Sequence, residues 1–143
     1  MRKSLKAIAG SLCVAGLPLG LTACSTDSVV WGQEGAAVRE ATNQFVTANK
    51  EADDSPGLCN GSAADLGTPS AWEGLSAGEP AKFSAKDWEA YGSLSPTWVI
   101  NLSHQSATRG AETKNVPVYL FFKGAGKDLC VAAIEWGEIT STS

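Results

Sequence analysis

His104 is the single histidine of this 143-residue chain, and histidine is the side chain that most often moves protons in catalysis. A catalytic histidine works beside an acid and a nucleophile. Ser103 and Ser106 lie close to it in sequence, but adjacent residues of a strand point to opposite faces of a sheet. Because no pattern places an acid and a nucleophile beside His104, we expect a surface histidine near the end of a strand.

Two other motifs match known sites only in part. Residues 124–127 contain the Gly-Lys pair of a phosphate-binding loop, which also needs a glycine five residues earlier and a serine or threonine afterwards. Phe121 and Asp128 occupy those positions, so we expect a hairpin turn. The acidic pairs Asp53-Asp54 and Asp87/Glu89 lack the alternating ligands and central glycine of a calcium loop. We therefore predict neither a metal nor a cofactor.

The first 24 residues have the order of an export signal: a basic start, an apolar run from Ala7 to Gly20, then Leu21-Thr22-Ala23-Cys24. These last four residues resemble the lipobox of bacterial membrane lipoproteins. The resemblance implies that the Cys24 sulfur receives a diacylglycerol and that cleavage falls between Ala23 and Cys24. Residues 1–23 would then be removed as a signal peptide. The expected location is the extracytoplasmic face of the cell membrane, with membrane lipid as the partner of acylated Cys24.

Two alternatives remain open for this segment. One is an uncleaved membrane anchor, although the apolar run of about 14 residues is shorter than the ~20 that a spanning helix needs. The other is a plain secretory signal that is cut elsewhere. Lipidation fits the sequence better than either alternative.

Removal of residues 1–23 would leave 120 residues, which suits one domain with a modest core. It would also leave eight Lys and Arg against fifteen Asp and Glu, so the mature domain is clearly acidic. A nucleic-acid partner is excluded on this basis, because no basic stripe exists to neutralise phosphates.

Cysteine pairing follows from the lipobox. With Cys24 taken by lipid in an oxidising compartment, Cys59 and Cys130 are left, and elimination predicts a disulfide between them. A metal pair is the rival interpretation, but it lacks further Cys or His ligands.

The elements that position these residues begin with a lipidated N-terminus and tether at 24–33. Within it, Val29-Val30-Trp31 is an apolar patch that we expect to pack on the domain, with the membrane interface as the alternative. Residues 34–49 show apolar spacings of three and four, which predict an amphipathic helix.

The middle of the chain, residues 58–82, is rich in Gly, Ser and Pro and predicts only short helical turns near 63–66 and 70–75. Ser84 resembles an N-cap of a short helix that places Trp88 and Tyr91 on one face. Three strands follow at 97–104, 116–123 and 129–136, the last reaching Ile139, and form an antiparallel meander. The prediction is a single α+β domain at 34–139 with a polar tail at 140–143.

This order of elements resembles the NTF2-like, cystatin-related cone architecture, which small lipoproteins of Gram-positive actinobacteria often share. The resemblance covers residues 34–139 and rests on element order and on Val116–Trp136. It implies an N-terminal amphipathic helix packed on a C-terminal curved antiparallel sheet. In this family the resulting cone binds a small apolar ligand, hosts catalysis or is filled by side chains.

Five tryptophans are many for a domain of this size, and exposed tryptophan often contacts sugars or proteins. Trp98 and Trp136 lie in predicted strands and favour the core, whereas Trp72 and Trp88 lie near loops. The candidate ligand surface therefore centres on Trp72 and Trp88 and extends to other residues on the sheet side: Tyr91, Trp98 and His104.

These observations favour a non-catalytic module at the cell envelope that binds an unknown small molecule or an envelope protein. One alternative is an NTF2-like enzyme with a buried carboxylate as base, for which Asp87, Tyr91 and His104 are the residues to test. Another is a structural accessory subunit of an envelope complex. We expect no enzyme activity.

Overall fold

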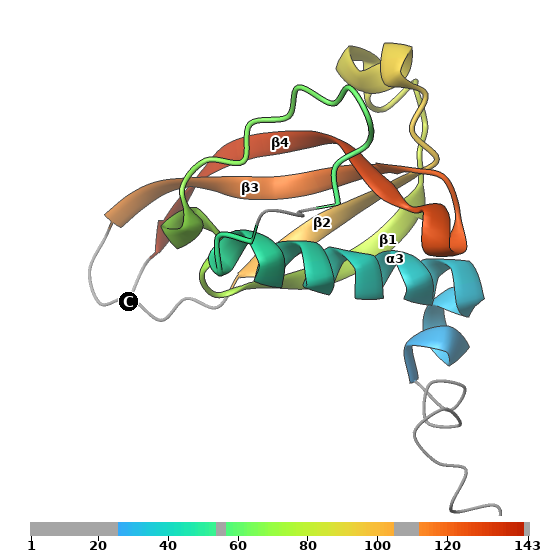
Figure 1. Cartoon of the computed structure of the whole chain (residues 1–143), viewed down its shortest axis with the longest axis horizontal. Coiled ribbons are helices and arrows are strands. Elements are labelled where there is room, and N and C mark those ends of the chain that lie inside the picture. The colour runs from blue at the N-terminus through green and yellow to red at the C-terminus, as the bar shows by residue number, and fades with distance from the viewer. Residues whose placement is uncertain (1–25, 54–56, 105–111, 142–143) are drawn as a thin grey trace, which may run out of the picture.

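One long helix, α3 (Thr26–Lys50), precedes four strands that pair in the order β1-β2-β3-β4, and each neighbouring pair is antiparallel (Figure 1). This computed structural model describes residues 26–53, 57–104 and 112–141. The fold is therefore α+β, with the helix first and the sheet last, as the sequence predicts. The strands are β1 (Leu75–Lys82), β2 (Trp98–His104), β3 (Glu112–Lys123) and β4 (Cys130–Ser141).

Short 3-10 helices connect these elements: η1 (Pro69–Trp72), η2 (Glu89–Leu94) and η3 (Gly126–Asp128). The proposed signal peptide, including Ala23 and Cys24, lies outside the described residues. In the part of the chain that the structure describes, no helix has the length and apolarity of a membrane span.

Helix α3 packs on the sheet through one apolar stripe. Of the predicted stripe, Val38 and Phe45 are buried and Ala41 and Ala48 are half-buried, and Val46 is buried beside them. Thr42 and Asn49 share the buried face, and each satisfies its side chain within the helix. The Thr42 hydroxyl donates to the Val38 carbonyl at 2.7 Å, and the Asn49 amide donates to the Phe45 carbonyl at 2.8 Å. The stripe therefore buries polar groups without leaving a hydrogen bond unmade.

The helix begins earlier than predicted and contains a break at Gly32, whose φ of 74° and ψ of 173° only glycine adopts readily. The segment expected as a tether therefore includes a helical turn at residues 26–31. Arg39 holds this turn in place, because its Nε donates to the Asp27 carboxylate at 2.8 Å.

We expected the apolar patch Val29-Val30-Trp31 to pack on the domain, and this expectation is wrong for Val29 and Val30. Val29 and Val30 are 84% and 64% exposed, whereas Trp31 is half-buried. The break at Gly32 explains the difference, because it turns residues 26–31 away from the axis along which α3 covers the sheet (Figure 1).

The sheet has four strands rather than the three that the sequence predicts, and β1 is the strand that the pattern missed. Gly78 and Pro80 interrupt the strand pattern in the sequence, since both residues are rare in strand interiors. The register between β1 and β2 shifts between Ala77 and Pro80, which marks a β-bulge. Such a bulge is typical of an edge strand, and β1 lies at one edge of the sheet.

The other predicted strands are present with longer bounds. β3 begins at Glu112 rather than Val116, and β4 runs to Ser141, into the expected polar tail. The predicted helical turn at 70–75 corresponds to η1, but residues 63–66 form no helix. The predicted helix from Ser84 is a turn followed by η2.

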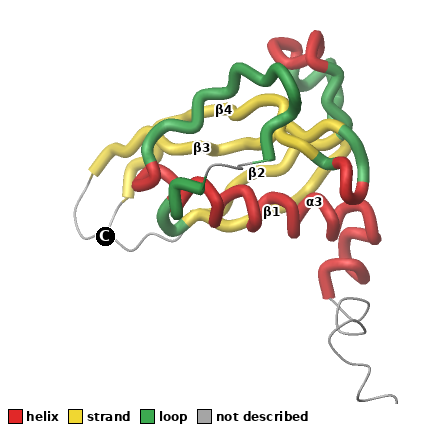
Figure 2. Tube along the Cα trace, in the orientation of Figure 1, coloured by secondary structure: helices red, strands yellow, loops and turns green. Residues whose placement is uncertain are grey.

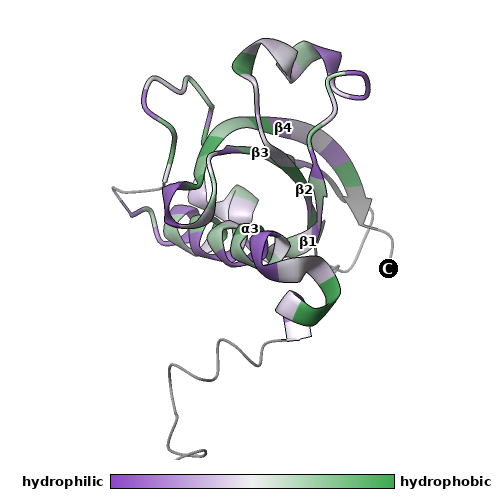
Figure 3. Cartoon of the chain, turned by 90° about the vertical axis from the view of Figure 1, so that its right-hand side faces the viewer, coloured by the Kyte–Doolittle hydropathy of each residue, from purple (hydrophilic) through white to green (hydrophobic). Residues whose placement is uncertain are grey.

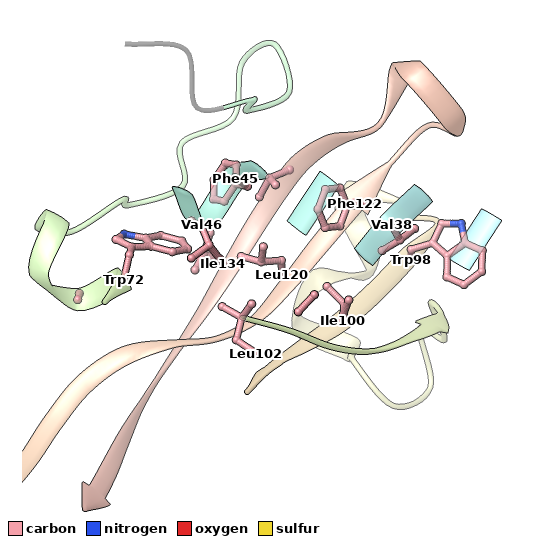
Figure 4. Packing of buried hydrophobic residues seen from close by; sticks show 13 residues of the cluster. Val38, Phe45, Val46, Trp72, Trp98, Ile100, Leu102, Leu120, Phe122 and Ile134 are labelled. Atoms are coloured by element: carbon pink, nitrogen blue, oxygen red, sulfur yellow. The ribbon is translucent and has the colours of Figure 1, made fainter. Parts of the chain in front are cut away.

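The sheet curves around α3, so helix and concave face enclose the main core (Figure 3). Side chains from every layer fill this space. They come from α3, from the loop before β1 and from all four strands (Figure 4), and the largest are Phe45, Trp72, Trp98, Ile100, Leu120 and Phe122. The interior of the cone is therefore occupied by the protein itself.

A second apolar cluster covers the convex face of the sheet. Val99, Phe121 and Ala133 are buried there beneath the segment that connects β1 to β2. Phe83, Trp88 and Tyr91 of that segment pack against them. β3 is thus covered on both faces, as its unbroken apolar run predicts.

The long loop after α3 runs alongside β4 (Figure 2) and is tied to it. Cys59 forms a disulfide with Cys130 across 4.8 Å between Cα atoms, which is the predicted pairing. Leu58 forms a parallel bridge with Val131, and the Cys59 N–H donates to the Val131 carbonyl at 2.9 Å. These contacts cover the β4 edge of the sheet.

Candidate functional site

The space between α3 and the concave face of the sheet is filled by side chains. Trp72 and Leu120 are fully buried between α3 and the sheet. A small depression of about 140 Å³ remains beside Phe45, Phe122 and Leu129. Ligand pockets are typically 300–1,000 Å³, so this depression is too small for an organic ligand.

An open trough of about 820 Å³ follows the side of α3 that faces away from the sheet. Its lining comes almost entirely from one helix, and a single helix face is convex. Its acidic members are Asp27, Glu40, Glu51 and Asp53, with alanines between them. Because its lining comes from one helix and the few residues after it and includes no aromatic side chain, we do not assign this surface a site.

A cleft of about 410 Å³ opens instead at the β1 edge and continues onto the convex face of the sheet. We call it the outer cleft, and its lining residues are Trp31, Glu79, Pro80, Ala81, Trp88, Val99, Asn101 and Tyr119. They come from α3, β1, the segment before η2, β2 and β3. Three aromatic residues, one asparagine and one glutamate therefore line one open space, and a mostly apolar lining with a few polar residues is the usual composition of a ligand site.

The aromatic wall of the outer cleft is fixed by ring packing. The rings of Trp88 and Tyr119 lie 4.7 Å apart at 62° to each other, so they form a corner. Trp88 also packs edge-on against Phe121 at 5.2 Å, and Tyr91 stacks on the same Phe121 ring at 4.1 Å. The buried Phe121 thus packs against Trp88 and fixes the position of its ring.

The polar floor of the outer cleft is fixed by the β-bulge. The Asn101 side-chain oxygen accepts a hydrogen bond from the Glu79 N–H at 2.7 Å. From the other side, the Arg39 guanidinium donates to the carbonyls of Ala77 and Gly78. These bonds satisfy backbone groups that the bulge leaves outside the β-ladder, and they hold Glu79 at the mouth of the cleft.

The structure separates the residues that the sequence grouped as a ligand surface. Trp72 and Trp98 are buried in the core, so neither belongs to an exposed ligand surface. Burial is what the strand position of Trp98 predicts, whereas for Trp72 the expected exposure is wrong. The ring of Trp72 has no exposed area, and its indole N–H donates to the Leu66 carbonyl at 2.7 Å. Trp88 alone of the set lines the outer cleft. Tyr91 stacks on Phe121, which in turn packs against Trp88. His104 is exposed at the end of β2.

The three residues of the enzyme alternative do not meet. His104 pairs with Leu75 at one end of β2, while Trp98, at the other end, pairs with Lys82 just before the turn that holds Asp87. Six residues of strand span about 20 Å. Asp87 and His104 therefore lie at opposite ends of the sheet, and neither lines a cavity with Tyr91. This arrangement contradicts the specific catalytic set of Asp87, Tyr91 and His104.

Among the described residues, no group of three His, Cys, Asp or Glu side chains could hold a metal ion. The cleft residues that the sequence did not single out are Trp31, Glu79, Asn101 and Tyr119. Two of them, Asn101 and Tyr119, could have been found from the sequence. The alternation of β2 and β3 places both residues on the face of the sheet opposite the core. Their pairing across β2 and β3 brings them side by side.

Comparison of the chain with protein-family models, with curated proteins and with solved structures finds no match.

Proposed function

We propose that the mature protein is a lipid-anchored module at the extracytoplasmic face of the membrane, and that it binds a ligand in the outer cleft without transforming it. The observation that carries the binding role is the convergence of Trp31, Trp88 and Tyr119 with Asn101 and Glu79 around open space. Rigid aromatic faces supply contact area, and the amide and carboxylate supply orientation.

The anchor part of the proposal rests on the lipobox resemblance and is supported by the disulfide. Cys59 and Cys130 pair, and disulfides persist in oxidising compartments outside the cytosol. Ser25 alone separates Cys24 from the first residue of α3. A lipid on Cys24 would therefore hold the N-terminal turn at the bilayer, where the exposed side chains of Val29 and Val30 meet an apolar surface.

A Cys24→Ala variant tests the anchor. Without the sulfur no diacylglycerol can attach, so we expect the uncut precursor to accumulate and incorporation of labelled palmitate to disappear. The Cys13→Ala variant is the matched control, because Cys13 lies inside the apolar run and leaves with the signal peptide; it should mature normally. Normal cleavage of the Cys24→Ala chain, in the presence of a signal-peptidase-II inhibitor as well, would contradict lipidation.

The binding role is tested on the protein purified from its membrane. Ligands that bind only the folded state raise the melting temperature by mass action. We expect at least one compound in a set of metabolites and cell-wall fragments to do so, and Trp88→Leu to abolish the rise. If no compound in such a set stabilises the protein, the binding role is wrong.

A further inference from the structure

We propose that the ligand of the outer cleft is a small organic cation, which the cleft holds by its ammonium group. This inference rests on the binding role proposed above and specifies its ligand class. It begins from the charges around the cleft. Glu79 is the one ionisable acid or base among the described lining residues apart from the Tyr119 phenol.

No basic side chain in the described part of the chain pairs with the Glu79 carboxylate. The nearby base on β1, Lys82, is already engaged: its Nζ lies 2.9 Å from the Glu34 carboxylate and 4.1 Å from the Trp98 ring centroid. Arg39 is engaged with Asp27 and with the backbone of the bulge. The cleft is therefore lined by one acidic residue, Glu79, whose carboxylate has no cationic partner among the described residues.

The aromatic walls favour the same ligand. The face of an aromatic ring carries partial negative charge, and tryptophan and tyrosine attract cations most strongly. Trp88 and Tyr119 both line the cleft and pack edge to face at 62°, and Trp31 lines it from the α3 side. Aromatic faces joined by one carboxylate are the arrangement that recognises alkylammonium groups.

The polar floor is compatible with such a ligand. The side-chain oxygen of Asn101 is already used by the Glu79 N–H. This bond fixes the bulge and thereby the position of the Glu79 backbone.

The test uses the protein purified from membranes in a polyoxyethylene detergent, with the indole N–H resonances of Trp31 and Trp88 as reporters. Choline is the cationic probe, and 3,3-dimethylbutan-1-ol is its neutral counterpart of the same shape. We expect choline to shift both indole signals at millimolar concentration and the neutral alcohol to leave them unchanged. Equal shifts with both probes would overturn the inference, because shape alone would then explain binding.

Substitutions separate the cleft charge from the general acidity of the domain. Glu79→Gln should weaken choline binding roughly 3- to 10-fold, while Glu73→Gln, the same change at an exposed site outside the cleft, should leave it unchanged. Tyr119→Phe keeps the ring and removes the hydroxyl, so it should preserve most of the affinity. Equal effects of the two glutamate variants would contradict the proposal.

Further measurements distinguish a soluble cation from a lipid headgroup. They also distinguish failure of the cationic ligand from failure of the proposed binding role. Shifts with dissolved choline alone indicate a soluble cation, whereas shifts with phosphatidylcholine vesicles as well indicate a lipid headgroup. Binding of N-acetylglucosamine in the cleft without binding of choline would overturn the cationic ligand and leave the binding module intact. Failure of every compound in the stability screen would overturn the binding module itself.

Discussion

Gly67 lies in a position that no other residue can occupy without strain. Its φ is +63°, and a Cβ built on it would lie 2.4 Å from Cη2 of Trp136. The Trp136 indole N–H donates to the Asp65 carbonyl at 3.1 Å, so the ring cannot swing away without losing this bond. One residue thus fixes the loop of residues 57–68 to β4 by close approach as well as by backbone conformation.

Gly61 provides a matched control for Gly67. It also has a positive φ, +78°, but nothing lies within 4 Å of a Cβ built there. Gly61→Ala should therefore cost only backbone strain, about 1 kcal/mol of unfolding free energy. Gly67→Ala should cost that plus about 1–3 kcal/mol for the collision with Trp136. Urea unfolding of both variants measures the difference, and equal losses would show that Trp136 moves aside freely.

At the scale of single residues, two tryptophans show how far a sequence pattern can predict burial. Trp98 alternates with Ile100 and Leu102, so its strand period indicates burial, and the structure agrees. Trp72 has no such period around it. Its burial depends on Phe45 of α3, whose ring lies 5.4 Å away, and on Trp136, at 6.3 Å. These partners are distant in sequence, so no local pattern could place Trp72 in the core.

At the scale of elements, β1 depends on side chains from its neighbours more than on its own sequence. Gly78 and Pro80 weaken it as a strand, and its bulge leaves backbone groups outside the ladder. Asn43 of α3 accepts from the Ala77 N–H at 2.9 Å, and Arg39 donates to the carbonyls beside it. The strand was missed in the sequence because what stabilises it lies on α3 and β2.

Arg39 should accordingly matter more than a surface ion pair. It is 22% exposed and makes hydrogen bonds to two carbonyls and to Asp27. Arg39→Ala should lower the free energy of unfolding by about 2 kcal/mol, as expected for hydrogen bonds from a charged group. The same variant should increase hydrogen exchange in β1, because the bulge carbonyls lose their partner.

The Glu34–Lys82 pair also links α3 to β1 and serves as the control. Its side chains are 66% and 67% exposed, so Glu34→Gln should change stability by less than about 1 kcal/mol. A loss for Glu34→Gln as large as that for Arg39→Ala would mean that general charge, rather than the bonds of Arg39 to β1, holds the edge strand.

For the molecule as a whole, more of the fold than of the candidate site could be predicted from the sequence. Helix periodicity and strand alternation are local, and they indicated α3, β2, β3 and β4 as well as the side of each that faces the core. The outer cleft is lined by residues from α3, from three strands and from the segment before η2, and these residues meet only once the sheet has formed. The filled cone is likewise a property of packing, which depends on side chains from every layer.

The disulfide acts on the whole molecule, because it joins residues 71 positions apart, in the loop after α3 and at the start of β4. A closed loop of this size restricts the unfolded chain and stabilises the fold by roughly 4 kcal/mol in the chain-entropy model. Reduction should therefore lower the melting temperature by about 10 °C or more for a domain of this size. Calorimetry with and without reductant measures the shift. The Cys59→Ala/Cys130→Ala double variant should melt at the reduced temperature under both conditions. If complete reduction left the melting curve of the native chain unchanged, the contacts of Leu58 and Ser62 with β4 would suffice to hold the loop, and the disulfide would contribute nothing to stability.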